Sequence, residues 1–299
     1  MDNVREKQIG ALGLCAFSAP AILFLPQADW RWTTVVVGMA MLIMIFGKPV
    51  DTGNSAKKMR FVGIPLFIWN IIIMSKTAWD ISGIHGVSSP LPGLLLLLLA
   101  AYGVKKEVLP VVGAVLVFFI VGIYGILYLF ALPDTELTKT VWQTQGGLNG
   151  ISFGFLPILL LYMYKGERRK EREIWALIGL LLVLGAMLIT KGMGASTFYT
   201  ASMSVNVLGA MERLEPFVGV ALTVGGFCLM GMLLSVNQSL WEKMKMEKRK
   251  YPIVLLTIVA GIGIWLVRKV DARIIEIGTT VCWGFVPILT QLVVTGKKE

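Results

Sequence analysis

One stretch of sequence, GGLNGISFGFLP at residues 146–157, decides how the chain is expected to fold. It lies inside an apolar segment at residues 141–164 and places four glycines and one proline within twelve residues. Glycine adopts left-handed backbone conformations readily, and proline removes a backbone donor from a helix. The stretch therefore predicts a helix that breaks inside an apolar span. The alternative is an unbroken helix with a glycine-rich packing face, although packing alone does not require the polar groups of Asn149 and Ser152.

A second interrupted span lies five apolar segments earlier. The first segment, residues 9–25, contains Pro20 within the sequence SAPA at residues 18–21. A break and an ordinary proline kink are both open there. Paired interruptions in two halves of a chain indicate the midplane binding site of a secondary transporter. We therefore predict a ligand-binding site formed by Ser18, Ala19, Pro20, Ala21, Asn149, Gly150, Ser152, Phe153 and Gly154.

The composition is that of an integral membrane protein. Of the 299 residues, 56% are hydrophobic and 15% are charged, whereas soluble domains usually carry about 25% charged residues. Apolar segments, the signature of membrane-spanning helices, lie at residues 9–25, 33–46, 61–81, 91–104, 108–132, 141–164, 174–190, 207–236, 253–267 and 274–294. The sequence predicts an all-α polytopic protein with ten transmembrane helices.

The distribution of lysine and arginine predicts the topology. With the N-terminus in the cytoplasm, the basic clusters at residues 48–60, 165–172 and 243–250 all lie on the cytoplasmic side, as the positive-inside rule requires. Both termini are then cytoplasmic. The basic residues at 268–273 are an exception, because they face outward. The net charge of +10 comes from these loops, so a nucleic-acid partner is not expected.

Three charged residues open the eighth apolar segment: Glu212, Arg213 and Glu215. An ionised group in lipid costs about 2.5–3.5 kcal/mol by insertion scales, so charges retained there need partners. Glu212 and Glu215 share one helix face at a spacing of three residues. A buried structural or gating network and a solvated helix end both remain open, because residues 216–236 alone supply the roughly 20 residues that span the membrane.

Enzymatic and metal-dependent functions find no motif. The three cysteines lie in apolar segments without CxxC spacing, and the chain has one histidine, His85. Zinc-protease, serine-hydrolase and P-loop signatures are absent. We predict no catalysis, no metal and no cofactor. Near the outer interface, Lys76 and Asp80 are expected to snorkel, and Glu276 is expected to offset Arg273 three residues earlier.

Four short motifs carry a family resemblance: ERLE at residues 212–215, YGVKKE at 102–107, ALPD at 131–134 and AILFLP at 21–26. Together they resemble the B-subunit family of spore nutrient germinant receptors, which belongs to the amino acid-polyamine-organocation superfamily of transporters. The resemblance implies one transmembrane domain, residues 1–299, of two inverted five-helix repeats at about 1–132 and 137–296, with helices one and six broken.

The same resemblance implies a function and partners. A small nutrient, with an amino acid as the expected class, binds between the two broken helices. The partners are a larger A-type membrane subunit and a C-type lipoprotein subunit, in the spore inner membrane or the cell membrane. An ion-coupled amino acid permease of the same superfamily is the alternative. Because the broken segments contain no carboxylate, recognition of a zwitterion is expected to rest on backbone groups and half-helix ends.

Overall fold

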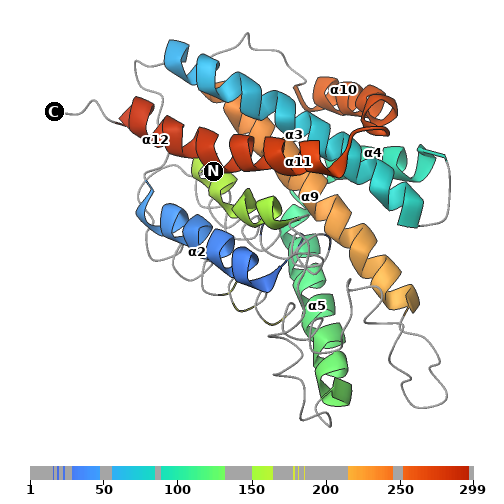
Figure 1. Cartoon of the computed structure of the whole chain (residues 1–299). Coiled ribbons are helices and arrows are strands. Elements are labelled where there is room, and N and C mark those ends of the chain that lie inside the picture. Colours follow the sequence, from blue (N-terminus) through green and yellow to red (C-terminus); the bar gives the residue numbers. More distant parts are fainter. Residues whose placement is uncertain are drawn as a thin grey trace.

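The computed structural model describes residues 16, 19, 23, 29–47, 56–84, 89–131, 150–163, 178, 181, 185, 215–244 and 252–295. Over these residues the structure is helical (Figure 1). Its elements are α2 (Trp30–Phe46), α3 (Ala56–Ile84), α4 (Leu91–Lys105), α5 (Leu109–Ala131), the 3-10 helix η2 (Ile151–Tyr162), α9 (Glu215–Lys243), α10 (Pro252–Val267), α11 (Ala272–Thr279), the π-helical η3 (Thr280–Phe285) and α12 (Val286–Thr295).

Three of the described helical stretches are long and apolar enough to cross a membrane. They are Met59–Gly83, Gly219–Lys243 and Ala272–Thr290, and they fall in the predicted third, eighth and tenth spans. Shorter apolar helices of 10–17 residues occupy the predicted second, fourth, fifth, sixth and ninth spans. The predicted all-helical class is therefore confirmed for the described residues, and the helices are those of a multi-pass membrane protein.

The two longest helices, α3 and α9, pack against each other in opposite directions. Near the start of α3, Arg60 Nε donates to the Met244 carbonyl just after α9, at 2.8 Å. Towards the other end, Ile81 of α3 lies against Gly226 of α9. Figure 1 shows the two helices crossing at the centre of the bundle. They form the frame on which the other helices pack.

Helices α4, α5 and α10 complete one side of this frame. The α4 helix packs on α3, α9 and α10, and α5 packs on α9. The α10 helix runs parallel to α3, as two contacts show. Ser75 Oγ donates to the Ala260 carbonyl at 2.8 Å, and further along both segments Arg268 lies 5.1 Å from the Trp79 ring centroid. Small residues allow this contact, because Gly263 of α10 lies against Ser75 of α3.

On the other side, α2 and η2 run parallel in close contact. Gly154 near the start of η2 faces Val36 and Val37 of α2, and Leu161 near its end faces Gly47. The α11, η3 and α12 segments follow one line beside η2 (Figure 1). Pro287 explains the π-helical turn between them, because a proline removes one helical hydrogen bond and its ring crowds the preceding turn.

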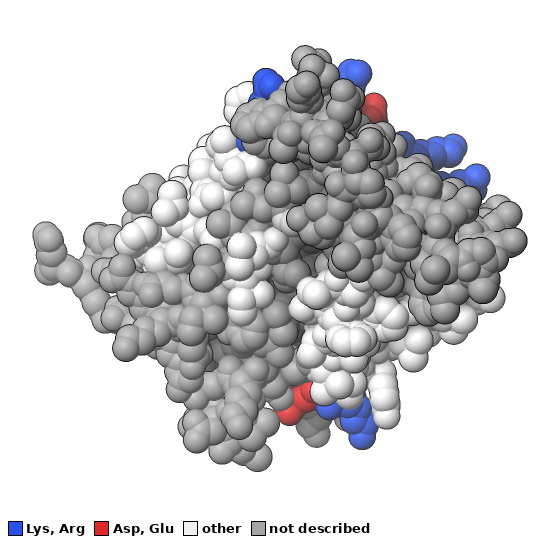
Figure 2. Space-filling view, turned by 90° about the horizontal axis from the view of Figure 1, so that it is seen from below, with Lys and Arg blue, Asp and Glu red and all other residues white. Residues whose placement is uncertain are grey.

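The outer surface of the described helices is strongly apolar. Phe61, Phe118 and Leu266 are 83%, 77% and 75% exposed. On the face shown in Figure 2, charged side chains of the described residues lie at two opposite edges, and the described surface between them is uncharged. Large exposed apolar areas are unusual on soluble monomers but suit contact with lipid.

Candidate functional site

The site is built at the N-terminal end of η2. Gly150 precedes this helix with a left-handed backbone, at φ 91°. The following twelve residues, Ile151–Tyr162, form a 3-10 helix rather than an α-helix. Runs of 3-10 helix longer than three or four residues are uncommon and mark strain or a hinge. The predicted break itself includes residues 146–149, which lie outside the described residues, so it stays a prediction.

The carboxylate of Glu276 caps η2. Its Oε2 accepts the Gly150 N–H at 2.8 Å, and its Oε1 accepts the Ser152 N–H at 2.7 Å. The first N–H groups of a helix have no partner within the helix, and the helix dipole places partial positive charge there. A carboxylate is therefore well matched to this end. Glu276 lies on α11, so the cap joins two segments more than one hundred residues apart in sequence.

This cap corrects two expectations from the sequence. Glu276 was expected to offset Arg273, but its carboxylate instead contacts the backbone at the start of η2. Backbone groups of the broken segments were expected to recognise a zwitterion, yet two N–H groups of span six already bind a carboxylate of the chain itself. A charged residue within a membrane span needs a partner. Glu276 lies in the tenth apolar segment, so this rule indicates that its carboxylate binds a group inside the protein.

Next to the cap is a buried hydroxyl without a hydrogen bond. Ser152 is 1% exposed, and its Oγ has no partner among the described residues. A buried donor or acceptor left without a partner costs about 1–3 kcal/mol. The hydroxyl belongs to the same residue whose N–H binds Glu276. Ser152 was predicted as a site residue, and its unpaired hydroxyl suits a ligand.

Two other predicted site residues pack against neighbouring helices. Phe153 meets Trp283 of η3 edge to face, with ring centroids 5.5 Å apart and planes at 89°. A side chain built at Gly154 would lie 3.0 Å from Val36 Cγ1 and 3.1 Å from Val37 Cγ2. The structure thus gives Gly154 a packing role against α2. Phe153 forms one contact between η2 and η3, and Phe155, which faces Gly284, forms another.

The remaining predicted site residues are only partly covered. Ala19 is fully buried, but Ser18, Pro20, Ala21 and Asn149 lie outside the described residues. The predicted charge network is also only partly covered. Glu212 and Arg213 are outside the described residues, and Glu215 is the first residue of α9. The joining of spans one and six, and the partners of these charges, therefore stay predictions.

A buried polar network ties η3 to the central frame. Asn70 Nδ2 donates to Asn237 Oδ1 at 2.7 Å, and Trp283 Nε1 donates to Asn70 Oδ1 at 2.8 Å. Asn237 Nδ2 in turn donates to the Phe67 carbonyl at 3.2 Å. Asn70 of α3 thus bonds to side chains of two other elements, α9 and η3. This network holds Trp283, and through it Phe153, in position.

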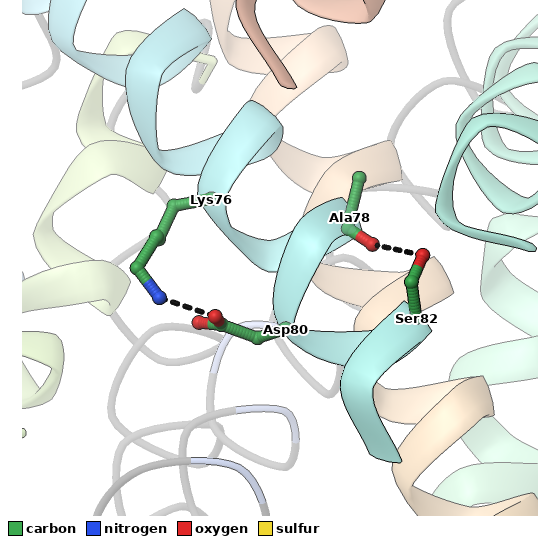
Figure 3. Close-up of polar contacts among 4 residues, drawn as sticks. All are labelled: Lys76, Ala78, Asp80 and Ser82. Atoms are coloured by element: carbon green, nitrogen blue, oxygen red, sulfur yellow. Dashed lines mark hydrogen bonds and ion pairs between the residues drawn. The ribbon is translucent and has the colours of Figure 1, made fainter. Parts of the chain in front are cut away.

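An ion pair lies on α3, away from the cap. Lys76 Nζ contacts Asp80 Oδ1 one helical turn later (Figure 3), with side chains 24% and 40% exposed. Both residues were expected to snorkel towards the interface, which stays a prediction, and their charges are paired with each other. Among the described residues, no group of three or more His, Cys, Asp or Glu side chains is placed to hold a metal ion.

No protein-family model matches the chain, and no curated protein matches it. The resemblance to germinant-receptor B-subunits stays a prediction carried by four short motifs. What the chain does must be inferred from its own residues.

Proposed function

We propose that this chain is a nutrient-binding membrane subunit of the germinant-receptor type, with an amino acid as the ligand class. The observation that carries the proposal is the start of η2. A left-handed glycine there precedes two N–H groups that bind a carboxylate and a buried hydroxyl that binds nothing. Helix N-termini at interrupted spans are where transporters of this architecture hold anionic substrate groups.

The packing of the described helices supports a two-fold repeat. Suppose that α3, α4 and α5 correspond to α9, α10 and the α11–α12 segment. Replacing each helix by its counterpart in the other half then predicts pairs of equivalent contacts. The contact of α3 with α10 becomes that of α9 with α4, and the contact of α5 with α9 becomes that of α12 with α3. All four contacts are present. This correspondence is the one expected of two five-helix repeats at about residues 1–132 and 137–296.

A second candidate is the ion-coupled amino acid permease. Lys76 and Asp80 lie within the membrane-crossing stretch of α3, and the Asp80 side chain is 40% exposed. Ionisable residues inside membrane spans commonly mark proton or ion pathways. Reconstitution in liposomes separates the two candidates: ion-driven accumulation of a bound amino acid supports the permease, and binding without uptake supports the receptor subunit.

The receptor proposal includes partners and a membrane location. The chain is expected to co-purify with an A-type membrane subunit and a C-type lipoprotein subunit from the spore inner membrane. No nucleic-acid partner is expected. Recovery of the chain alone, under conditions that preserve other membrane complexes, would favour the permease.

Replacing Gly150 by valine is expected to abolish ligand binding. At φ 91° a β-branched residue is strongly disfavoured, so the backbone that presents the N–H groups must change. The purified chain is screened in detergent by thermal shift against the common amino acids, several sugars and several nucleosides. We expect one responsive compound in the wild type and a complete loss of its shift in Gly150→Val.

The matched control is Gly122→Val. Gly122 lies in α5, and a side chain built there meets no atom within 4 Å. This variant should retain the thermal shift of the responsive compound. A shift of equal size in Gly150→Val and wild type would remove the start of η2 from the binding site.

Cysteines introduced at Thr52, Gly166 and Glu247 are expected to be protected from an impermeant thiol reagent in intact cells. The physical reason is the clustering of basic residues in these three connections, which places them in the cytoplasm. The chain without an added cysteine serves as the background, and permeabilised cells show that each site is reactive. Labelling of any site from outside would contradict the ten-span topology.

A further inference from the structure

We infer that Glu276 is a built-in competitor for the ligand: its carboxylate occupies a carboxylate-binding site at the start of η2, and the carboxylate of a small ligand takes its place. This inference rests on the proposed function, because it treats the start of η2 as the ligand site. It adds the class of ligand group that binds there and a residue that regulates binding.

The first step is the geometry of the cap. Each carboxylate oxygen of Glu276 accepts one N–H, at 2.8 Å from Gly150 and 2.7 Å from Ser152. Both distances are short for an N–H donor, as charge-assisted hydrogen bonds are. Nothing in this arrangement depends on the rest of the glutamate side chain. A free carboxylate has the same two oxygens at the same spacing, and it can form both bonds.

The second step concerns the Ser152 hydroxyl, a hydrogen-bond donor that Glu276 does not bind. The Ser152 hydroxyl is buried and has no partner among the described residues, although it belongs to the residue that donates its N–H to the cap. A tethered carboxylate must bind where α11 holds it. A free carboxylate is not restrained in this way and can also accept the hydroxyl proton. The ligand thus gains a hydrogen bond that Glu276 does not make.

The third step is the position of Glu276 itself. It is half-buried, and it lies on the eight-residue helix α11, which leads directly into the π-helical η3. Trp283 of η3 contacts both Phe153 and Asn70. Release of the Glu276 carboxylate therefore frees α11 next to one of the contacts that link η2 to the central frame; another is the hydrogen bond from Ser239 Oγ of α9 to the Tyr162 carbonyl. Ligand binding at η2 is coupled by this route to the tenth span.

The test is chemical rescue of Glu276→Ala by acetate. Removing the side chain opens a space of the size and chemistry of acetate at the two N–H groups. The purified full chain is heated in detergent with sodium acetate, with acetamide, or with sodium chloride of equal ionic strength. Acetate should raise the Tm of Glu276→Ala by about 2–4 °C in a saturable way. Acetamide and chloride should have no such effect, and wild type should respond at least threefold less.

Two further variants sharpen the result. Asp271 is an exposed carboxylate on the same helix and caps the Arg273 N–H at 2.9 Å, so Asp271→Ala removes an equivalent bond where no site exists; acetate should not rescue it. Adding Ser152→Ala to Glu276→Ala should at least halve the acetate shift, whereas the Tm without acetate should stay the same or rise, because the removed hydroxyl has no partner among the described residues. Equal acetate shifts in wild type, Asp271→Ala and Glu276→Ala would overturn the inference.

Glu276→Gln covers the case in which the alanine variant does not fold. The amide is nearly the same shape and keeps one acceptor oxygen, but it has no charge to hold it at the helix end. Acetate should displace it more readily than it displaces the wild-type carboxylate, and the Tm shift should exceed that of wild type. A shift no larger than in wild type would again count against a competitor role.

The acetate experiment tests the role of Glu276 and the nutrient screen tests the proposed function, so either can fail while the other succeeds. Rescue of Glu276→Ala by acetate, without any responsive compound in the wild type, would leave the carboxylate site standing and refute the nutrient-binding function. A responsive amino acid whose shift is lost in Gly150→Val, without rescue by acetate, would support the function and refute the role of Glu276.

Discussion

Asn70→Ala is expected to lower the Tm by roughly 5–10 °C, corresponding to a loss of about 2–4 kcal/mol. Asn70 is fully buried, donates to Asn237 and accepts from Trp283. Truncation therefore removes the donor to Asn237 Oδ1 and the acceptor of the Trp283 Nε1–H. In membrane bundles a single interhelical hydrogen bond contributes about 0.6 kcal/mol, with values near 1.7 at most, and the vacated volume adds a packing term.

The control for this prediction is Ser235→Ala. Ser235 lies on α9, two residues before Asn237, but its hydroxyl donates to the Gly231 carbonyl of its own helix, at 2.9 Å. Its removal should change the Tm by less than about 2 °C. Thermal unfolding of the two purified variants decides the matter. Similar Tm values for Asn70→Ala and Ser235→Ala would mean that the buried network contributes little to holding η3 against the frame.

Helix type followed from the sequence because long apolar runs leave few alternatives in lipid. A membrane-spanning segment must satisfy its backbone hydrogen bonds internally, so the apolar run at residues 253–267 predicted α10 to within one residue. The end of α9 was predicted at Val236, where polar residues begin, but the helix continues to Lys243. Leu240 and Met244 are buried there, so inward packing on one face extends the helix beyond the apolar run.

The candidate site could be predicted only in part. Glycine and proline content marked the start of η2, and the left-handed Gly150 is where that signal placed unusual backbone. The partner of this backbone was not predictable. Local spacing rules pair Glu276 with Arg273, whereas its carboxylate contacts residues more than one hundred positions earlier. Such a contact follows from how the tenth span lies beside η2, and no short-range pattern contains that information.

The glycines show the same limit. In the sequence, Gly93, Gly122 and Gly154 are equivalent residues within apolar spans. In the structure, Gly154 faces two valines of α2, Gly122 faces open space, and Gly93 contacts a backbone carbonyl. Whether a position tolerates a side chain larger than glycine therefore depends on the neighbouring helix. Substitution at each position therefore tests the three-dimensional packing rather than helix propensity.

Gly93→Ala is expected to destabilise the protein by about 2–3 kcal/mol, although alanine is the better helix former by about 1 kcal/mol. A Cβ at Gly93 of α4 would overlap the Ala78 carbonyl of α3. The Gly93 N–H also donates to Ser82 Oγ at 2.9 Å. Figure 3 shows the next bond, from that hydroxyl to the Ala78 carbonyl at 3.0 Å. The alanine would force α3 and α4 apart and break this chain of bonds.

The direction of the change in Tm distinguishes the effect of helix packing from that of helix propensity. Gly122→Ala, at the exposed position in α5 where nothing lies within 4 Å, should leave the Tm unchanged or raise it slightly, because only propensity acts there. Gly93→Ala should lower the Tm by roughly 5–8 °C. Small residues allow membrane helices to approach closely, and the α3–α4 contact depends on that approach. If Gly93→Ala unfolds at the same temperature as Gly122→Ala, the two helices are not held at the separation that the structure gives them.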